Sequence, residues 1–241
     1  MQKAWCRFSG LGAALLAAAG ALAACAQAPE ASGPAQAAPS PAPLYIVTYT
    51  EFIPSARASA AALLKKVCGA NRKAAGNLGC VAAQEIGRSE RFVLLKIWRD
   101  QAAADGAAAQ TAPLEAKLDA LRAAPADRRI NAGMAVGPAR GAIGPDALYA
   151  VTHLDVVPPR KDDAAVVIAQ WRADNIKDAG AIRLDVLQQA NRPNHFTLIE
   201  AWKNRAAFDA YIAAPHTANF RAAVGPMQGA LYDERLYRAI D

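Results

Sequence analysis

The same order of residues occurs twice in this 241-residue chain, at a constant offset of 104 positions. The segment LYIVTYTEFIP, residues 44–54, aligns with LYAVTHLDVVP, residues 148–158. Without a gap, RFVLLKIW at residues 91–98 aligns with HFTLIEAW at residues 195–202. One offset shared by two separate segments indicates an internal duplication, with a period longer than that of solenoid repeats. The chain is therefore expected to fold as two copies of one unit.

Each copy alternates strand-like and helix-like segments in the order β-α-β-β-α-β. Residues 44–53 are rich in β-branched and aromatic residues and stop at a proline, which predicts a strand. Alanine and leucine then recur at helical spacing over residues 55–76, up to a glycine. The remaining strands are expected near 80–87, 91–98, 129–136, 148–157, 182–190, 195–202 and 231–238, and the remaining helices near 100–109, 113–124, 161–178, 204–213 and 216–226. This order predicts an α+β fold of two ferredoxin-like repeats.

Segments poor in large apolar residues separate these copies from each other and from the N-terminus. The stretch between the copies is rich in glycine and proline, which is typical of a linker. Residues 25–43 are rich in alanine and proline and cannot bury a core, which indicates an extended tether. We therefore expect a first domain at 44–136, a linker at 137–147 and a second domain at 148–241.

Residues 1–24 have the pattern of an export signal. Two basic residues precede an apolar run of about 14 residues, which is too short to cross a bilayer as a helix. The run ends in Leu22-Ala23-Ala24-Cys25, which resembles the bacterial lipoprotein box. The resemblance implies cleavage before Cys25, lipid on its thiol and a position on the periplasmic side of the outer membrane. Cleavage as an ordinary secretory signal, giving a soluble periplasmic protein, is the alternative.

Charge and motifs argue against several classes of function. The net charge is +6, but lysine and arginine are scattered, which favours a solvated surface over nucleic-acid binding. The three histidines lack the spacing of metal ligands, and no HExxH pattern occurs, so no metal is expected. GxGxxG, P-loop and GxSxG patterns are also missing, which argues against a nucleotide cofactor and a serine hydrolase.

The segment FTLIEAWKNRAAFDAYIAAPHTANF, residues 196–220, resembles the antibiotic biosynthesis monooxygenase family of the dimeric α/β-barrel superfamily. Members of that family usually pair two such domains face to face, so two copies in one chain imply an intramolecular pseudo-dimer. The resemblance also implies a monooxygenase without a cofactor, which oxidises a quinol or a related aromatic with O2. A non-catalytic module that binds a small apolar or aromatic ligand in the cell envelope is the alternative, and further oligomerisation stays open.

The resemblance suggests where the chemistry lies. His216 falls on the second histidine position of the family motif, and Tyr211 occupies the first. The first copy has Ala107 and Ala112 at these positions, so the second copy is expected to hold the active pocket and the first to be its degenerate, structural half. A phenolic substrate would need a general base of modest pKa.

Strand alternation places Phe196, Glu200 and Trp202 on one face, which we expect to line a cavity between the two sheets. Catalytic candidates are His216, Tyr211 and Glu200. The alternatives are helix capping or surface exposure for His216, core packing for Tyr211, and an ion pair with Lys96 on the opposing sheet for Glu200. Substrate-binding candidates are Trp202, Phe196, His153, Phe220 and Trp98, for which core packing or a position at the pocket edge is the alternative.

One further histidine and one pair of cysteines are open at this stage. His195 is expected in the loop before the strand at 195–202. Cys68 and Cys80 are the cysteines left in the fold after Cys25, and the periplasm would permit a disulfide between them. Two buried free thiols are the alternative.

Overall fold

The computed structural model describes residues 42–240. The expected signal segment, Cys25 and nearly all of the tether lie outside this range. No helix among the described residues combines the length and the apolar character needed to cross a membrane.

The two copies contain equivalent elements in the same order. The first copy consists of β1 (Leu44–Glu51), η1 (Pro54–Ala56), α1 (Arg57–Lys73), β2 (Asn77–Glu85), β3 (Arg91–Trp98), α2 (Gln101–Asp119) and β4 (Asp127–Ala135). The second consists of β5 (Leu148–Asp155), η2 (Pro158–Arg160), α3 (Lys161–Asn175), β6 (Ala181–Gln189), β7 (Arg192–Trp202), α4 (Arg205–Ile212), α5 (Pro215–Val224), η3 (Gly225–Met227) and β8 (Asp233–Ala239). The chain is thus an α+β fold of two ferredoxin-like repeats, as predicted.

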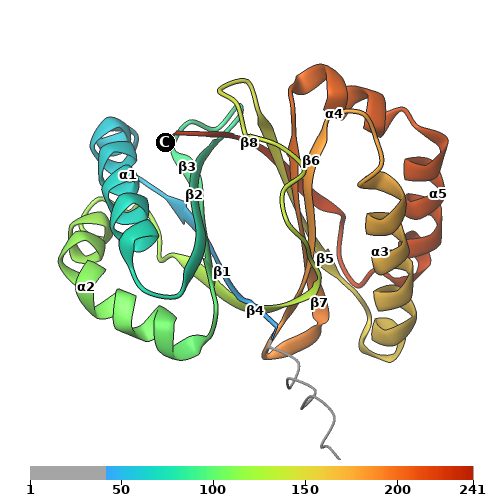
Figure 1. The fold of residues 1–241 in the computed structure, drawn as a ribbon, viewed down its shortest axis with the longest axis horizontal. Coiled ribbons are helices and arrows are strands. Elements are labelled where there is room, and N and C mark those ends of the chain that lie inside the picture. Colours follow the sequence, from blue (N-terminus) through green and yellow to red (C-terminus); the bar gives the residue numbers. More distant parts are fainter. Residues whose placement is uncertain (1–41, 241) are drawn as a thin grey trace, which may run out of the picture. The chain divides into compact units, whose positions relative to one another are not determined.

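The strands form one closed barrel in the order β1-β3-β2-β8-β5-β7-β6-β4. Within each copy the order is that of a ferredoxin-like sheet, and all neighbouring strands run antiparallel. Two seams join the copies, β2 with β8 and β4 with β6. Figure 1 shows the two curved sheets facing each other, with α1 and α2 outside one sheet and α3, α4 and α5 outside the other. The copies therefore form an intramolecular pseudo-dimer.

The same local signals position the second helix in both copies. The side chain of Asp100 accepts a hydrogen bond from the Ala103 amide at 2.8 Å, and that of Asn204 accepts one from the Ala207 amide at 2.9 Å. These side chains are N-caps, which satisfy amides that the first helical turn leaves without partners. The two caps are 104 residues apart, so the offset of the duplication is kept up to the start of the second helix.

The turn before β2 and β6 is also repeated. Gly76 and Gly180 have φ angles of +77° and +85°, in the left-handed region that favours glycine. A Cβ atom on either glycine would lie 2.6 Å from an alanine Cβ at the start of the following helix. Glycine at both positions therefore allows the turn and the helix to pack closely.

The helix after β3 differs from the sequence prediction. We expected two helices split near Pro113, but α2 runs without a break through this proline. Thr111, two residues before it, donates its hydroxyl to the carbonyl of Ala107 at 3.1 Å. In the second copy the equivalent stretch is divided into α4 and α5, and Pro215 begins α5, where a missing amide is tolerated.

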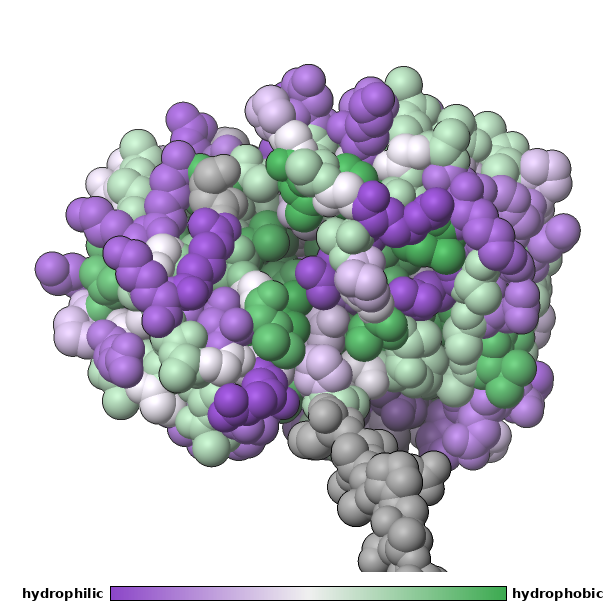
Figure 2. Space-filling view, viewed as in Figure 1, coloured by the Kyte–Doolittle hydropathy of each residue, from purple (hydrophilic) through white to green (hydrophobic). Residues whose placement is uncertain are grey.

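The two faces of each sheet have different partners. Thr197, Ile199 and Ala201 are buried, and Ile199 and Ala201 belong to a barrel-interior cluster with Tyr45 and Tyr149 from the two copies. Phe196, Leu198 and Trp202 pack instead with residues of α3, α4 and α5. The predicted orientation of β7 was therefore wrong, because the smaller residues fill the crowded barrel and the larger ones meet the helices. Figure 2 shows apolar residues at the centre of one face, between the copies, with hydrophilic residues around them.

Cys68 and Cys80 form a disulfide that links α1 to β2, with 12 residues of separation and 5.4 Å between their Cα atoms. The second copy has Arg172 and Leu184 at these positions, and the guanidinium of Arg172 donates to the Leu184 carbonyl at 2.7 Å. In the first copy Arg72 of α1 also donates to the Cys80 carbonyl, so both copies link this helix and strand by an arginine hydrogen bond and the first adds a covalent link.

Candidate functional site

The predicted aromatic residues of the second copy gather in one place, but they fill it. Tyr211 stacks on Trp202 with 4.6 Å between ring centroids and an interplanar angle of 18°. Trp171, which the sequence analysis did not single out, donates its indole N–H to the Tyr211 hydroxyl at 3.1 Å and lies 5.5 Å from the ring of Phe220. Each of these side chains is at most 5% exposed. The space between β7 and the helices is therefore hydrophobic core.

Glu200 is enclosed in this core. It is 0% exposed, and its Oε2 accepts a hydrogen bond from Trp202 Nε1 at 2.9 Å. Oε1 has no hydrogen-bond partner among the described residues. Burial raises the pKa of Glu200 to about 8, against the opposite effect of the Trp202 hydrogen bond. The alternative of an ion pair with Lys96 was wrong, because Glu200 faces its own helices and Lys96 pairs with Glu115.

His216 lies away from the tyrosine with which it was grouped. Its Nε2 is 2.9 Å from Asp178 Oδ2, and its side chain is 38% exposed. It lines a groove of about 410 Å³ between α3 and α5, together with Trp171 and Phe220. Trp171 lines this groove and also contacts Tyr211, whereas Glu200 is fully enclosed in the core. The motif therefore aligned His216 with a family position, but His216 does not share a site with Tyr211 and Glu200.

The other two histidines lie together at one end of the barrel. His153 Nε2 is 3.1 Å from His195 Nδ1, and the two rings line a polar pocket of about 230 Å³. Burial lowers the pKa of His153 to about 4, helped by the charge of Arg129. His195 belongs to β7, where it pairs with Asp155 of β5. Its prediction as a loop residue was therefore wrong. The strand begins at Arg192, three residues earlier than the sequence suggested.

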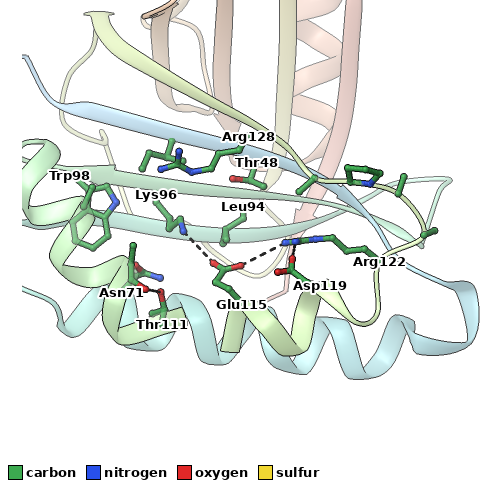
Figure 3. Close-up of a pocket in the computed structure, with 17 residues that line it drawn as sticks. Thr48, Asn71, Leu94, Lys96, Trp98, Thr111, Glu115, Asp119, Arg122 and Arg128 are labelled. Carbon is green, nitrogen blue, oxygen red and sulfur yellow. Dashed lines mark hydrogen bonds and ion pairs between the residues drawn. The ribbon is translucent and has the colours of Figure 1, made fainter. Parts of the chain in front are cut away.

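A cavity of about 790 Å³ lies in the first copy, between its sheet and α1 and α2 (Figure 3). We call it the first-copy pocket. Its sheet face carries Ile46, Thr48, Leu94, Lys96, Trp98 and Arg128, and its helix face carries Asn71, Ala104, Ala108, Thr111, Glu115 and Asp119, with residues 122–126 closing one side. The first copy was expected to be the degenerate half, whereas it holds the open site.

Small side chains explain why this space is open. Ala104 and Ala107 in α2 stand where the second copy has Phe208 and Tyr211 in α4. Both alanines pack beside Trp98, as Phe208 and Tyr211 pack beside Trp202. In α1, Val67 likewise stands where α3 has Trp171.

A chain of ion pairs crosses the floor of the first-copy pocket. Lys96 Nζ lies 3.4 Å from Glu115 Oε1, and Glu115 Oε2 lies 3.7 Å from a guanidinium nitrogen of Arg122. Arg122 also pairs with Asp119. Figure 3 shows Lys96 pointing from the strand toward Glu115 on the helix below it. The pocket thus combines apolar walls with a polar, charged floor, as small-molecule sites do.

Among the described residues, no three His, Cys, Asp or Glu side chains gather closely enough to hold a metal ion. The pocket chemistry that the structure displays consists of ammonium, guanidinium, carboxylate, hydroxyl and indole groups. These groups can bind an aromatic ring, hold an oxyanion and accept a proton.

One signal in the sequence could have located the open site. The alanines at positions 104 and 107, read against Phe208 and Tyr211, mark a loss of side-chain volume beside a retained tryptophan. We instead took the alanine at 107, where a histidine was expected, as the loss of a site.

Comparison with known proteins relates the second copy to a family and the whole fold to solved structures. Residues 147–223 match the model of the antibiotic biosynthesis monooxygenase family. No curated protein matches the chain in sequence.

A candidate monooxygenase from Fusobacterium nucleatum has a similar structure, with a TM-score of 0.77 and 13% identity over 83% of this chain and 94% of its own. One from Lactobacillus acidophilus gives 0.71 and 11% over 83% and 95%. An anthrone oxidase-like protein gives 0.63 and 14% over 83% and 92%. At these identities the likeness establishes the two-copy barrel fold alone.

Proposed function

We propose that this chain, whose second copy matches the antibiotic biosynthesis monooxygenase family, oxidises a quinol or related aromatic with O2 in its first-copy pocket. The observation that carries the proposal is the cavity of about 790 Å³ between sheet and helices, which is lined by Trp98 and by the small side chains of Ala104 and Ala108. The second copy supports the barrel, and its own site is filled by aromatic side chains.

The pocket residues fit an oxidation in which the substrate supplies the electrons. Glu115 is the carboxylate placed to take a phenolic proton, and Lys96, 3.4 Å from it, stabilises the phenolate that results. Trp98 and the apolar wall hold the ring. One atom of O2 is inserted into a ring C–H bond of the quinol as a hydroxyl group. The two hydroquinone hydroxyl groups lose their hydrogens as the ring becomes a hydroxyquinone, and these two hydrogens leave with the other oxygen atom as water. This balance needs no added cofactor.

Two observations favour a second candidate, a binding module without catalysis. The first-copy pocket has no histidine in its lining. Glu115 is already held by Lys96 and Arg122, so a phenol would have to compete with these two partners for its carboxylate. In this alternative the same pocket binds a small aromatic molecule and releases it unchanged.

Oxygen uptake separates the two candidates. The full-length protein is offered a panel of hydroquinones and naphthohydroquinones in an oxygen electrode, beside Glu115→Gln and two controls outside the pocket, Glu200→Gln and His216→Ala. We expect saturable uptake above autoxidation in the wild type and both controls, and loss of at least about tenfold in Glu115→Gln. Binding of a quinol without uptake in any variant would support the binding module instead.

The place of action is part of the same proposal. The LAAC sequence at Leu22–Cys25 supports export with a lipid on Cys25, and the Ala/Pro-rich residues up to 43 would hold the barrel at the periplasmic side of the outer membrane. Fractionation of cells carrying Cys25→Ser tests the anchor, since the unlipidated protein would leave the membrane fraction. A wild-type protein found in the soluble fraction would favour the soluble periplasmic alternative.

A further inference from the structure

We infer that the ligand of the first-copy pocket is an aromatic carboxylic acid, whose carboxylate is bound by Trp98 Nε1 and Lys96 Nζ. The inference rests on the proposed use of this pocket and names the class of molecule that enters it. It derives from a comparison of the two copies of the chain with each other.

The first observation is a buried donor without an acceptor. Trp98 lines the pocket and is 1% exposed, and its Nε1 has no hydrogen-bond partner within residues 42–240. A buried indole N–H that lacks a partner costs free energy, because the group has lost its bond to water. A ligand acceptor at this atom would remove that cost.

The second copy shows which acceptor fits. Trp202 stands at the position equivalent to Trp98, and its Nε1 donates to the carboxylate of Glu200 at 2.9 Å. Glu200 lies two residues before the tryptophan on the same face of the strand. The first copy has Lys96 at that place, and an ammonium group has no lone pair to accept with. The carboxylate that the second copy supplies from its own chain is thus missing beside Trp98.

A second position on the same sheet face has also changed its charge. Thr48 pairs with Arg128 across β1 and β4, and Thr152 pairs with Glu234 across β5 and β8. Arg128 and Glu234 are therefore equivalent by register. The charge of Glu234 acts to raise the pKa of Glu200, which places two acids near each other in the filled copy. The open copy has Lys96 and Arg128 instead, and both line the pocket.

These charges favour an ionised ligand over a neutral one. The pocket lining contains three cations, Lys96, Arg122 and Arg128, and two carboxylates, Glu115 and Asp119. Arg122 pairs with both Glu115 and Asp119. The three cations outnumber the two carboxylates, so the lining has one net positive charge. A ligand carboxylate has two oxygens, one for Trp98 Nε1 and one for Lys96 Nζ, and charged partners strengthen both bonds.

The rest of the pocket favours a ring attached to that carboxylate. Ile46, Leu94 and the indole of Trp98 give one apolar wall, and the alanines of α2 give the other. Figure 3 shows Trp98, Lys96 and Leu94 on the strand, facing the helix that carries Thr111 and Glu115. A planar ring between these walls would bring a substituent at its edge to Lys96.

The test compares an acid with a neutral molecule of the same shape. Binding of 2-naphthoate and of 2-naphthamide to the full-length protein is measured by calorimetry. We expect the acid to bind at least about tenfold more tightly, which corresponds to about 1.4 kcal/mol. Lys96→Glu, which recreates the Glu–Trp pair of the second copy, should abolish this preference, and Trp98→Phe should reduce it. Glu200→Gln is the matched control and should leave it unchanged.

A second readout follows the indole itself. In ¹⁵N-labelled protein, the signal missing from Trp98→Phe identifies the Trp98 N–H, and it should shift with naphthoate more than with naphthamide. Equal affinities for the two compounds, with the Trp98 signal unmoved, would overturn the inference and leave an aromatic-binding pocket in place. That result would also mean that water alone serves Trp98. If neither compound binds, both the inference and the proposed use of the pocket are wrong.

Discussion

Glu200 and Lys96 are equivalent residues of the two copies with opposite charges and different partners. Both occupy the same position on equivalent strands, two residues before a buried tryptophan. The carboxylate of Glu200 satisfies the indole and is sealed in an aromatic core, whereas the ammonium of Lys96 leaves the indole without an acceptor in an open pocket. The two copies thus differ in charge at this position, and the carboxylate acceptor present beside Trp202 is missing beside Trp98.

The raised pKa of Glu200 makes the stability of the protein depend on pH. Between the pKa of an unfolded glutamate, about 4.3, and the folded value of about 8, the unfolded chain releases a proton that the folded chain retains. Stability from the protonated form is complete below the lower value and is lost as the pH rises through this window. Glu200→Gln, which keeps an acceptor for Trp202, should therefore stabilise the protein at pH 8 by on the order of 5 kcal/mol and change little at pH 4.5.

Urea denaturation of wild type and Glu200→Gln at both pH values measures this difference. Asp209→Asn, on the exposed surface of α4, is the control for loss of a carboxylate and should show no such trend. Equal stabilities of wild type and Glu200→Gln at pH 8 would mean that Glu200 is ionised in the folded protein.

At the residue scale the sequence predicted which side chains are special but not where they point. Trp202, Tyr211, Phe196 and Phe220 do gather in one core cluster. The facing of β7 could not be deduced, because a barrel buries both faces of its strands and alternation then distinguishes two interiors rather than inside from outside. Trp171 was missed because it lies on α3, outside the motif.

At the scale of elements, a helix can open or close the space above its sheet. α2 presents alanines at 104 and 107 where α4 presents Phe208 and Tyr211, although the strands beneath keep their tryptophans. The side chains of the second helix therefore determine whether a copy has a pocket. Exchanging these side chains between the copies should open or close the pocket.

The double variant Ala104→Phe/Ala107→Tyr should close the first-copy pocket. The added rings would occupy the space beside Trp98 that Phe208 and Tyr211 occupy beside Trp202. We expect ligand affinity to fall by at least about tenfold while the protein stays folded, because the new side chains enter an existing cavity rather than a filled core. Calorimetry with 2-naphthoate and a thermal melt measure the two effects.

Ala109→Tyr adds the same ring to the solvent-exposed side of α2 and should leave binding unchanged. Full binding by the double variant would show that ligands occupy another part of the molecule. Loss of folding would show instead that Lys96 and Glu115 cannot adjust to the larger rings.

The order of elements was predicted well, since hydrophobic period, prolines and glycines are local signals. Their details depended on contacts that those signals do not contain. Pro113 was taken as a helix boundary, yet α2 continues through it, and a proline alone does not distinguish a break from an interior position. β7 begins at Arg192, earlier than expected, because Gln189 of β6 extends the pairing to that residue.

At the scale of the whole described unit, the barrel is one cooperative structure. The interior cluster draws Tyr45, Val47 and Leu95 from the first copy and Tyr149, Ile199 and Tyr237 from the second. A buried network also joins the copies, since the Tyr45 hydroxyl donates to Asp185 at 3.1 Å and Arg183 pairs with the same carboxylate. Neither copy alone would bury this face or pair both edges of its sheet.

A destabilising change in one copy should therefore unfold both together. Ile168→Ala removes a fully buried side chain of α3 and should cost about 2–5 kcal/mol. A urea titration that follows the indole NMR signals of Trp98, Trp171 and Trp202 should show all three disappearing at one, lowered midpoint. A Trp98 signal that stays native after the other two are lost would show that the first copy folds by itself.

The duplication itself was readable because a fixed offset leaves matched residues across the chain. Closure of the barrel was not, since pairing of β2 with β8 and of β4 with β6 joins residues far apart in sequence and leaves no local pattern. The resemblance to a family of paired domains, rather than any single strand, predicted it.

Joining the two copies in one polypeptide releases each from being a copy of the other. When identical chains associate about a two-fold axis, every substitution occurs on both sides of the axis. Here the exchange of Glu200 for Lys96, or of Tyr211 for Ala107, affects one side only. One copy can keep the residues that stabilise the barrel while the other accumulates substitutions in its pocket. Such substitutions need not destabilise the fold. The loss of symmetry thus allows the two copies within one chain to take different roles.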